Sequence, residues 1–234
     1  MSETYPHTYP ARAPVVLELP DARRAQFITR TYGHLLAAIL GFTAVEVVLF
    51  QTGLAAPIAR AMLSVSWLLV LGGFMVVGWL FSGMAARAES RSTQYLALAG
   101  YVVAEAILFV PLLFIAEYVA PGAIGSAAVV TLLGFSGLTA IAMYSGKDFT
   151  FMGGMLRWGA VVALVLIAGS LLFGFSLGVI FSVAMVALAG AAILYETSKV
   201  LRTYPEDRYV SAALSLFASV ALMFWYVLTI FSRR

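Results

Sequence analysis

Seven long apolar runs dominate the sequence, and they leave few folds open to the chain. Each has roughly the 17–25 residues that a helix needs to cross about 30 Å of hydrocarbon at about 1.5 Å per residue. Spanning segments must satisfy their backbone hydrogen bonds internally, and a barrel would need alternating strands instead of continuous apolar runs. We therefore expect an all-α, polytopic membrane protein with seven transmembrane helices, at residues 32–50, 62–84, 95–118, 122–144, 155–173, 177–200 and 210–231.

The composition excludes several other classes of protein. Of the 234 residues, 62% are apolar and 11% are charged, whereas an ordinary soluble domain has about 25% charged residues. So few charges cannot coat a water-soluble enzyme or a nucleic-acid-binding domain. The chain has no cysteine and two histidines, which excludes disulfides and argues against thiolate or histidine-cluster metal sites. We therefore expect no cofactor and no tightly bound metal.

Several catalytic motifs are missing from the sequence. It contains no H-E-x-x-H, G-x-S-x-G or P-loop pattern. A seven-helix retinal protein would need a Schiff-base lysine within its last helix. The two lysines, Lys147 and Lys199, stand at the ends of predicted helices instead. We therefore expect no covalent catalysis, and the chain is predicted not to be an enzyme.

The charges in the loops predict the orientation of the chain. With the amino terminus in the cytoplasm, eleven of the 14 basic residues fall on the cytoplasmic side, as the positive-inside rule requires. This orientation accounts for the net charge of +3 without a nucleic-acid partner. The cytoplasmic set is Arg12, Arg23, Arg24, Arg30, Arg87, Arg91, Lys147, Arg157, Lys199, Arg202 and Arg208. We interpret residues 1–30, with their four prolines, as a mobile cytoplasmic tail and residues 31–234 as the transmembrane domain.

The division between the fifth and sixth predicted spans rests on one short break. Residues 155–200 are too many for a single span, and the interruption is the segment from Gly174 to Gly178. Its G-x-x-x-G spacing is also typical of a helix-packing face. The length of the apolar stretch favours a tight turn at this point.

Two acidic residues inside predicted spans are candidates for function, because a charge at the bilayer centre costs about 2.5–3.5 kcal/mol on insertion scales. Glu105 lies about ten residues, or roughly 15 Å, into the third span. It is followed by Pro111, which removes a backbone donor and predicts a kink. Either Glu105 takes part in a cation or proton path, or it is a protonated, hydrogen-bonded group that helps helices pack.

Glu196 stands near the cytoplasmic end of the sixth span, and Lys199 is within its reach three residues later. The pair is either an interfacial ion pair or the inner mouth of a pathway. Ser211, Ser215 and Ser219 recur every four residues on the last span and form one polar stripe. We expect this stripe to face the bundle interior, for ordinary helix packing or for conduction.

Other charged residues have simpler interpretations. Glu46 and Glu117 are expected near the outer interface, since each lies toward the outer end of its span. Arg87 and Arg91 follow the second span, where arginines mark topology and extend their charge to the interface. Either arginine could also pair with Glu196 on the same side.

The carboxyl-terminal third resembles the transmembrane Bax inhibitor motif family in its bacterial form. The residues that carry the resemblance are I-L-Y-E-T-S at 193–198 and A-A-L-S-L-F at 212–217, after a short basic loop. The segment G-K-D-F-T-F-M-G-G at 146–154 is similar to the family's loop after the fourth helix. The number and orientation of the helices agree with the family over residues 30–231.

The resemblance implies a seven-helix bundle with the last helix at its centre, and a pH-sensitive calcium leak. In such members two aspartates, on the sixth and seventh helices, share a hydrogen bond, and an arginine near the inner end of the second helix acts as a latch. The helix-six aspartate corresponds to Glu196, the helix-seven aspartate to Ser219, and the latch falls near Arg87. Where many members have small residues before the proline of the third helix, this chain has Glu105.

The serine in place of an aspartate changes the expected chemistry. Two adjacent carboxylates cannot easily both ionise, which makes such a pair sensitive to pH near neutrality. A Glu–Ser pair lacks that repulsion, so we expect a calcium or cation leak channel in which pH gating is weakened, or displaced to Glu105. Glu196, Ser219, Glu105 and Ser215 are the predicted ion pathway and pH sensor.

The alternative is a membrane-embedded modulator of a membrane protease or of other membrane proteins, without ion conduction. In that case the carboxylates are structural and the amino-terminal tail is the contact. A transporter is a third possibility, which the absence of an obvious internal repeat weakens. The expected partners are membrane lipid, calcium or other cations and a membrane protein, and the expected location is the bacterial inner membrane.

Overall fold

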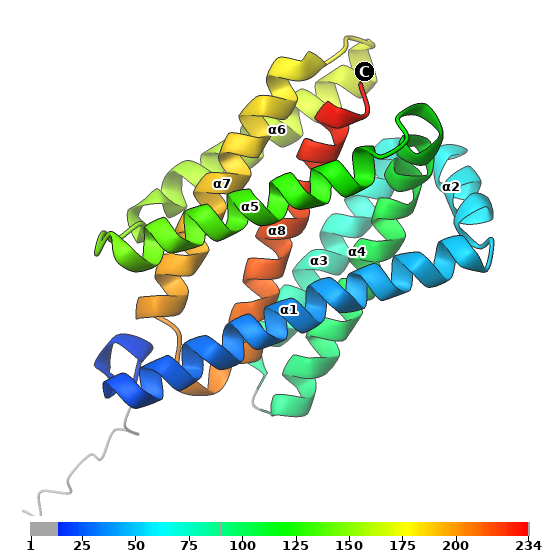
Figure 1. Cartoon of the computed structure of the whole chain (residues 1–234). Coiled ribbons are helices and arrows are strands. Elements are labelled where there is room, and N and C mark those ends of the chain that lie inside the picture. The colour runs from blue at the N-terminus through cyan, green and yellow to red at the C-terminus, as the bar shows by residue number, and fades with distance from the viewer. Residues whose placement is uncertain (1–13, 89, 234) are drawn as a thin grey trace, which may run out of the picture.

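A computed structural model describes residues 14–88 and 90–233, which form a helical bundle (Figure 1). These residues contain eight α-helices and three short 3₁₀ helices. The α-helices are α1 (Asp21–Gln51), α2 (Ala55–Leu63), α3 (Trp67–Arg87), α4 (Arg91–Val119), α5 (Ala123–Tyr144), α6 (Gly153–Phe173), α7 (Gly178–Arg202) and α8 (Tyr209–Phe231). The 3₁₀ helices are η1 (Val16–Glu18), η2 (Thr150–Met152) and η3 (Glu206–Arg208).

The prediction of an all-α, seven-span membrane protein is confirmed. The described residues contain no β-strand, and seven of their helices are long and apolar enough to cross a membrane. The chain turns between α6 and α7 as the length of the apolar stretch predicts. Gly174 and Gly178 have φ angles of 73° and 65° at this turn, in the left-handed region that glycine adopts at little cost.

One predicted span is divided in the structure. The apolar run at 62–84 crosses the boundary between α2 and α3, because α3 begins at Trp67. The hydroxyl of Ser64 bonds back to a carbonyl of α2, 2.8 Å away, and so competes with continuation of the helix. The short α2 packs its alanines against Val110 of α4. Hydropathy alone does not reveal such a break, since the residues on both sides of it are apolar.

The first span begins earlier than its apolar core. α1 starts at Asp21, directly after Pro20, whereas the apolar run starts at residue 32. Phe27 in the first turns of α1 is buried, and so is Val16 in η1. Residues 1–13 lie outside the described part of the chain. The predicted division at residue 30, between a tail and the transmembrane domain, stays a prediction.

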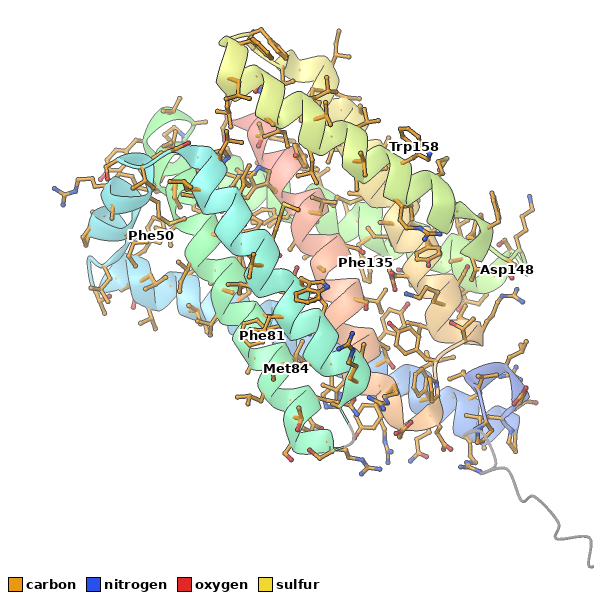
Figure 2. All side chains as sticks on the ribbon, turned by 180° about the vertical axis from the view of Figure 1, so that it is seen from behind. Phe50, Phe81, Met84, Phe135, Asp148 and Trp158 are labelled. Carbon is orange, nitrogen blue, oxygen red and sulfur yellow. The ribbon has the colours of Figure 1, made fainter. Side chains whose placement is uncertain are left out.

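The last helix lies at the centre of the bundle, as the resemblance implied. Figure 1 shows α8 with α3 and α4 on one side and α6 and α7 on the other, and with α1 and α5 crossing in front of it. It packs against α1, α3, α4, α5 and α7, and side chains such as Leu214, Leu216 and Leu228 are almost completely buried. Outer helices present apolar side chains outward instead: Trp158 of α6 is 72% exposed and points away from the bundle (Figure 2). This distribution of buried and exposed apolar side chains is expected when the central helix contacts protein and the outer helices contact lipid.

The alternating direction of the spans gathers most of the basic residues at one end. At this end α1, α4, α6 and α8 begin, and α3, α5 and α7 end. We call it the basic end, and the other the opposite end. The basic end is the one that the loop charges assign to the cytoplasm, and that orientation stays a prediction.

Candidate functional site

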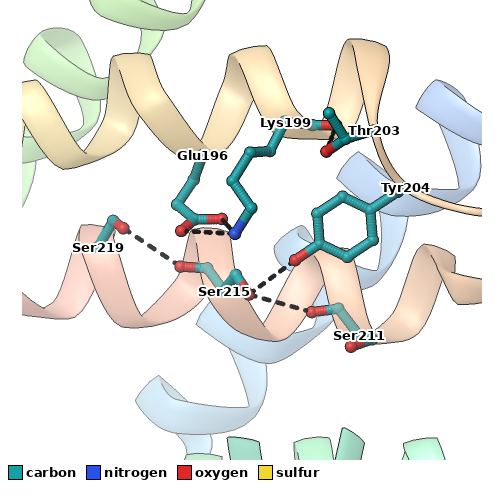
Figure 3. A network of polar contacts seen from close by, with 7 residues as sticks. All are labelled: Glu196, Lys199, Thr203, Tyr204, Ser211, Ser215 and Ser219. Carbon is teal, nitrogen blue, oxygen red and sulfur yellow. Dashed lines mark hydrogen bonds and ion pairs between the residues drawn. The ribbon is translucent and has the colours of Figure 1, made fainter. Parts of the chain in front are cut away.

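A row of polar side chains lies between α7 and α8 at the basic end. We call it the α7–α8 seam, and Figure 3 shows its members. Glu196 and Lys199 extend from α7 toward α8, and the Lys199 Nζ lies 3.2 and 3.0 Å from the two carboxylate oxygens of Glu196. The Glu196 side chain is 16% exposed and that of Lys199 is 29% exposed. The other members are Tyr204, Ser211, Ser215 and Ser219.

The serine stripe of α8 faces protein, not lipid. Ser211 and Ser219 are buried, and Ser215 is half-buried. The hydroxyl of Ser219 donates to the Ser215 carbonyl at 3.2 Å, and that of Ser215 lies 3.5 Å from the Ser211 carbonyl. These bonds satisfy the hydroxyls within the helix, a common arrangement for serine in an apolar environment. The hydroxyls of Ser215 and Ser219 therefore do not require a hydrogen-bond partner on another helix.

Tyr204 completes the seam from the loop between α7 and α8. Its hydroxyl is 3.0 Å from the Ser215 hydroxyl. Burial, together with the nearby Glu196 carboxylate, raises the pKa of Tyr204 above its ordinary value. The Tyr204 ring also lies 5.6 Å from the Lys199 ammonium, and the Tyr195 ring lies 5.0 Å from it. A neutral tyrosine at this position supplies both a hydrogen bond and an aromatic face to the seam.

The structure brings Glu196 and Ser219 to the same seam without joining them. Among the described residues, the hydrogen-bond and ion-pair partner of Glu196 is Lys199, and the Ser219 hydroxyl bonds within α8. The carboxylate is therefore neutralised by an ammonium group on its own helix.

Glu105 belongs to a different part of the bundle. It is 5% exposed on α4 and accepts a hydrogen bond of 2.9 Å from the Tyr101 hydroxyl, one turn earlier on the same helix. The Tyr101 ring packs edge-on against Phe217 of α8, with centroids 6.1 Å apart. Within the described residues Glu105 makes no hydrogen bond or ion pair with the α7–α8 seam. α4 continues as a helix through Pro111.

Arg87 and Arg208 both lie near the end of α3, and the latch role expected of Arg87 stays a prediction. Arg87, the predicted latch, is exposed, and the described structure shows no ion pair between it and Glu196. Arg208 instead donates from Nη1 to the carbonyls of Ala85 and Ala86, at 3.4 and 3.2 Å. A cation at the carboxyl end of a helix is favoured by the helix dipole. Arg208 stands directly before an apolar run, a position typical of an interfacial arginine. The sequence therefore does not predict its contact with α3.

The loop between α5 and α6 is fastened to α7 next to the seam. The backbone N–H of Phe149 donates to the Ser198 hydroxyl at 3.2 Å, and Arg202 donates to the Gly146 carbonyl at 3.1 Å. Asp148 accepts a hydrogen bond of 2.9 Å from the backbone N–H of Thr150. This bond lowers the pKa of Asp148 below its ordinary value, and Arg202 contributes less. The loop therefore holds the end of α7 that carries Glu196.

Glu46 faces the interior of the bundle, and its expected place near the outer interface stays a prediction. It is 7% exposed, and neither of its carboxylate oxygens has a hydrogen-bond partner in the described structure. Glu117, expected in the same region, is exposed. The distribution of apolar residues along α1 does not indicate which side of the helix faces the bundle, so it does not predict that Glu46 points inward. No group of three histidine or acidic side chains that could hold a metal ion exists among the residues described.

Comparison with known proteins identifies the family. Residues 24–234 match the Bax1-I family model, described as inhibitor of apoptosis-promoting Bax1. The chain belongs to this family. The match includes all seven spanning helices and the α7–α8 seam, so the resemblance seen in the motifs at 193–198 and 212–217 is confirmed.

Relatives of the chain come from bacteria and a plant. It is 36% identical over 109 residues to the uncharacterized protein PA2604 of Pseudomonas aeruginosa, covering 46% of this chain and 49% of the relative. It is 34% identical over 101 residues to the modulator of FtsH protease YccA of Escherichia coli K12, covering 43% and 46%. It is 33% identical over 112 residues to LIFEGUARD 4 of Arabidopsis thaliana, covering 45% and 44%. In these matches the chain spans about half the length of each relative.

The location of the protein follows from the fold and the family together. Seven helices are long and apolar enough to span a membrane. The YccA protein of Escherichia coli O6:H1, 34% identical over 101 residues, is named an inner membrane protein. The chain is a multi-pass inner membrane protein of the Bax inhibitor family.

Proposed function

We propose that this Bax inhibitor family protein is a slow cation leak, with calcium as the cation, and that the α7–α8 seam is its inner mouth. The observation that carries the proposal is the Glu196–Lys199 pair, at 3.0 Å, beside the polar stripe of the central helix. An ionisable residue in a span that faces the bundle interior is a candidate for an ion path. Glu196 is the acidic member of the seam, and the serines and Tyr204 add oxygen atoms.

The proposed resting state is closed by the protein's own cation. The Lys199 ammonium satisfies the Glu196 carboxylate, so calcium must compete with a tethered charge three residues away on the same helix. Such a group has a high effective concentration and does not diffuse away. Passage of a cation therefore requires the Lys199 ammonium, which also lies 5.0 and 5.6 Å from the rings of Tyr195 and Tyr204, to leave Glu196.

The proposed gating differs from that of a carboxylate pair. With Ser219 opposite Glu196 there is no second carboxylate to share a proton, so the leak should change little between pH 6 and 8. The buried hydrogen bond between Tyr101 and Glu105 does not reach the seam. If Glu105 is the pH sensor instead, it acts through α4, the helix that carries it, and α4 packs against α8.

Calcium flux into liposomes tests this proposal. The full chain is reconstituted with a calcium indicator inside, and flux is measured at pH 6 and pH 8. We expect Lys199→Met to raise the flux about tenfold, which corresponds to about 1.4 kcal/mol, because the competing ammonium is gone. Lys147→Met, which removes an exposed lysine of the α5–α6 loop, should leave the flux unchanged.

Three further variants separate the outcomes. Ser219→Asp should introduce a steep dependence on pH, because it restores a pair of carboxylates. A steep dependence in the unmodified protein that disappears in Glu196→Gln would contradict the weakened gating. Loss of pH dependence in Glu105→Gln would instead place the sensor on α4. Absence of flux from the unmodified protein and from every variant would remove the leak proposal.

A second function is favoured by the similarity to YccA, whose name describes a modulator of FtsH protease. We propose as the alternative that the chain regulates a membrane-anchored protease by contact and conducts no ion. The experiment is to add the full chain to proteoliposomes containing FtsH and measure how fast FtsH degrades a membrane substrate. A chain without residues 1–13 keeps η1 and α1 and tests whether the amino-terminal segment makes the contact. Changed degradation without calcium flux would favour the modulator.

A further inference from the structure

A cavity of about 460 Å³ lies between α1, α4, α5 and α8, away from the α7–α8 seam. We call it the Glu46 cavity, after the buried acid in its wall. Glu46 is five residues before the end of α1 at Gln51, roughly 8 Å along the helix. The cavity therefore lies toward the opposite end of the bundle.

Two side chains in the wall of this cavity carry buried polar atoms that are not paired within the part of the chain described. Both carboxylate oxygens of Glu46 are buried and have no hydrogen-bond partner within residues 14–88 and 90–233, and the same holds for the buried hydroxyl of Thr131. Buried polar groups are normally paired, because an unpaired one costs free energy and an unpaired charge costs more. The described lining holds a second acid, the exposed Glu117, and no lysine, arginine or histidine. An ionised Glu46 would need a positive partner, and the described lining does not supply one.

The remaining wall is apolar and rich in aromatic rings. Phe42, Phe217 and Phe224 line the cavity. Phe109 behind them holds two of these rings: it meets Phe42 edge-on at 5.1 Å and stacks on Phe224 at 5.6 Å. Aromatic faces attract organic cations, most strongly where water is excluded. A calcium ion, in contrast, requires about 6–8 oxygen ligands, and this wall offers few oxygens.

We propose that the Glu46 cavity binds an organic ammonium cation with a compact apolar body. Glu46 is the counter-ion, the phenylalanine rings surround the cationic group, and the aliphatic wall accommodates the body. The volume is within the range of about 300–1,000 Å³ typical of small-molecule sites. We assign the site to a free small molecule, because the two acyl chains of a phospholipid would have to remain outside it. This assignment is independent of the proposed leak, since Glu46 is not part of the seam.

The probe for this site is benzyltrimethylammonium, which carries a permanent charge next to an aromatic ring. Its binding to the full chain in maltoside micelles is measured by saturation-transfer NMR and by calorimetry. Neopentylbenzene has the same shape with carbon in place of nitrogen, so it should fail to displace the probe. Phosphatidylethanolamine added to the micelles should also fail to displace it. Displacement by that lipid would overturn the assignment to a free small molecule.

Matched variants test the role of the buried acid. Glu46→Gln should weaken binding of the probe at least about tenfold, equivalent to about 1.4 kcal/mol. Glu117→Gln, at the exposed acid of the same cavity, should change the affinity much less. Phe224→Leu keeps the carboxylate and removes one ring, and it should also weaken binding. Equal affinity in the unmodified protein and in a folded Glu46→Gln variant, or no binding by the unmodified protein, would overturn the proposal.

Discussion

Tyr101 and Glu105 show how a buried acid on α4 is paired inside the bundle. The carboxyl group of Glu105 accepts its hydrogen bond from the Tyr101 hydroxyl, and both side chains are buried. We expect Tyr101→Phe to lower the free energy of unfolding by about 1–2 kcal/mol, because Glu105 then lacks its partner. Thermal unfolding in detergent measures the effect. Tyr118→Phe is the control, since that side chain is 74% exposed, and an equal loss in both variants would contradict the role of the bond.

Individual contacts were predictable only where residues are close in sequence. The three-residue spacing of Glu196 and Lys199 predicts their pairing, and the structure contains it. The four-residue spacing of the serines predicts an inward stripe, which is confirmed by the burial of Ser211 and Ser219. Tyr204 meets Ser215 across a turn of the chain. Nothing in local spacing indicates such a contact, since it depends on how α8 docks.

At the scale of elements, the α5–α6 loop has a predictable response to acid. The Thr150 N–H lowers the pKa of Asp148, so the ionised form contributes stability above the ordinary aspartate pKa. That contribution is lost as the pH falls through the lowered pKa. Carbon-13 NMR titration of the Asp148 carboxyl should give a midpoint below the ordinary value. Arg202→Gln should leave most of this depression, because Thr150 is the larger cause, and a return to the ordinary value would contradict the assignment.

The elements themselves were more predictable than their boundaries. Hydropathy locates all seven spans, because lipid imposes the same minimum length on every helix. The turn at Gly174 follows from the same length argument. Hydropathy misses the break at Ser64 and the early start of α1 at Asp21. It averages apolar character over many residues, and neither feature changes that average. The contact of Arg208 with the end of α3 depends on tertiary packing and was equally hidden.

The orientation of the whole molecule is open to a direct test, because the chain has no cysteine of its own. Single cysteines are placed at Thr52, at the opposite end, and at Lys147, at the basic end. In cells with a permeabilised outer membrane, a membrane-impermeant maleimide should label Thr52→Cys at once. It should label Lys147→Cys only after lysis, because the positive-inside rule puts that loop in the cytoplasm. The reverse pattern of labelling would show that the orientation is wrong.

The central position of α8 has a consequence for how the protein is made. A ribosome delivers the helices in order, and α8 is the last of those described. The earlier spans enter the bilayer before the helix that fills their middle exists. Until α8 arrives, the face of α4 that packs against α8 has no permanent neighbour. Completion of the bundle therefore waits until α8 has been translated, and a nascent chain halted before Tyr209 would lack the helix that fills its centre.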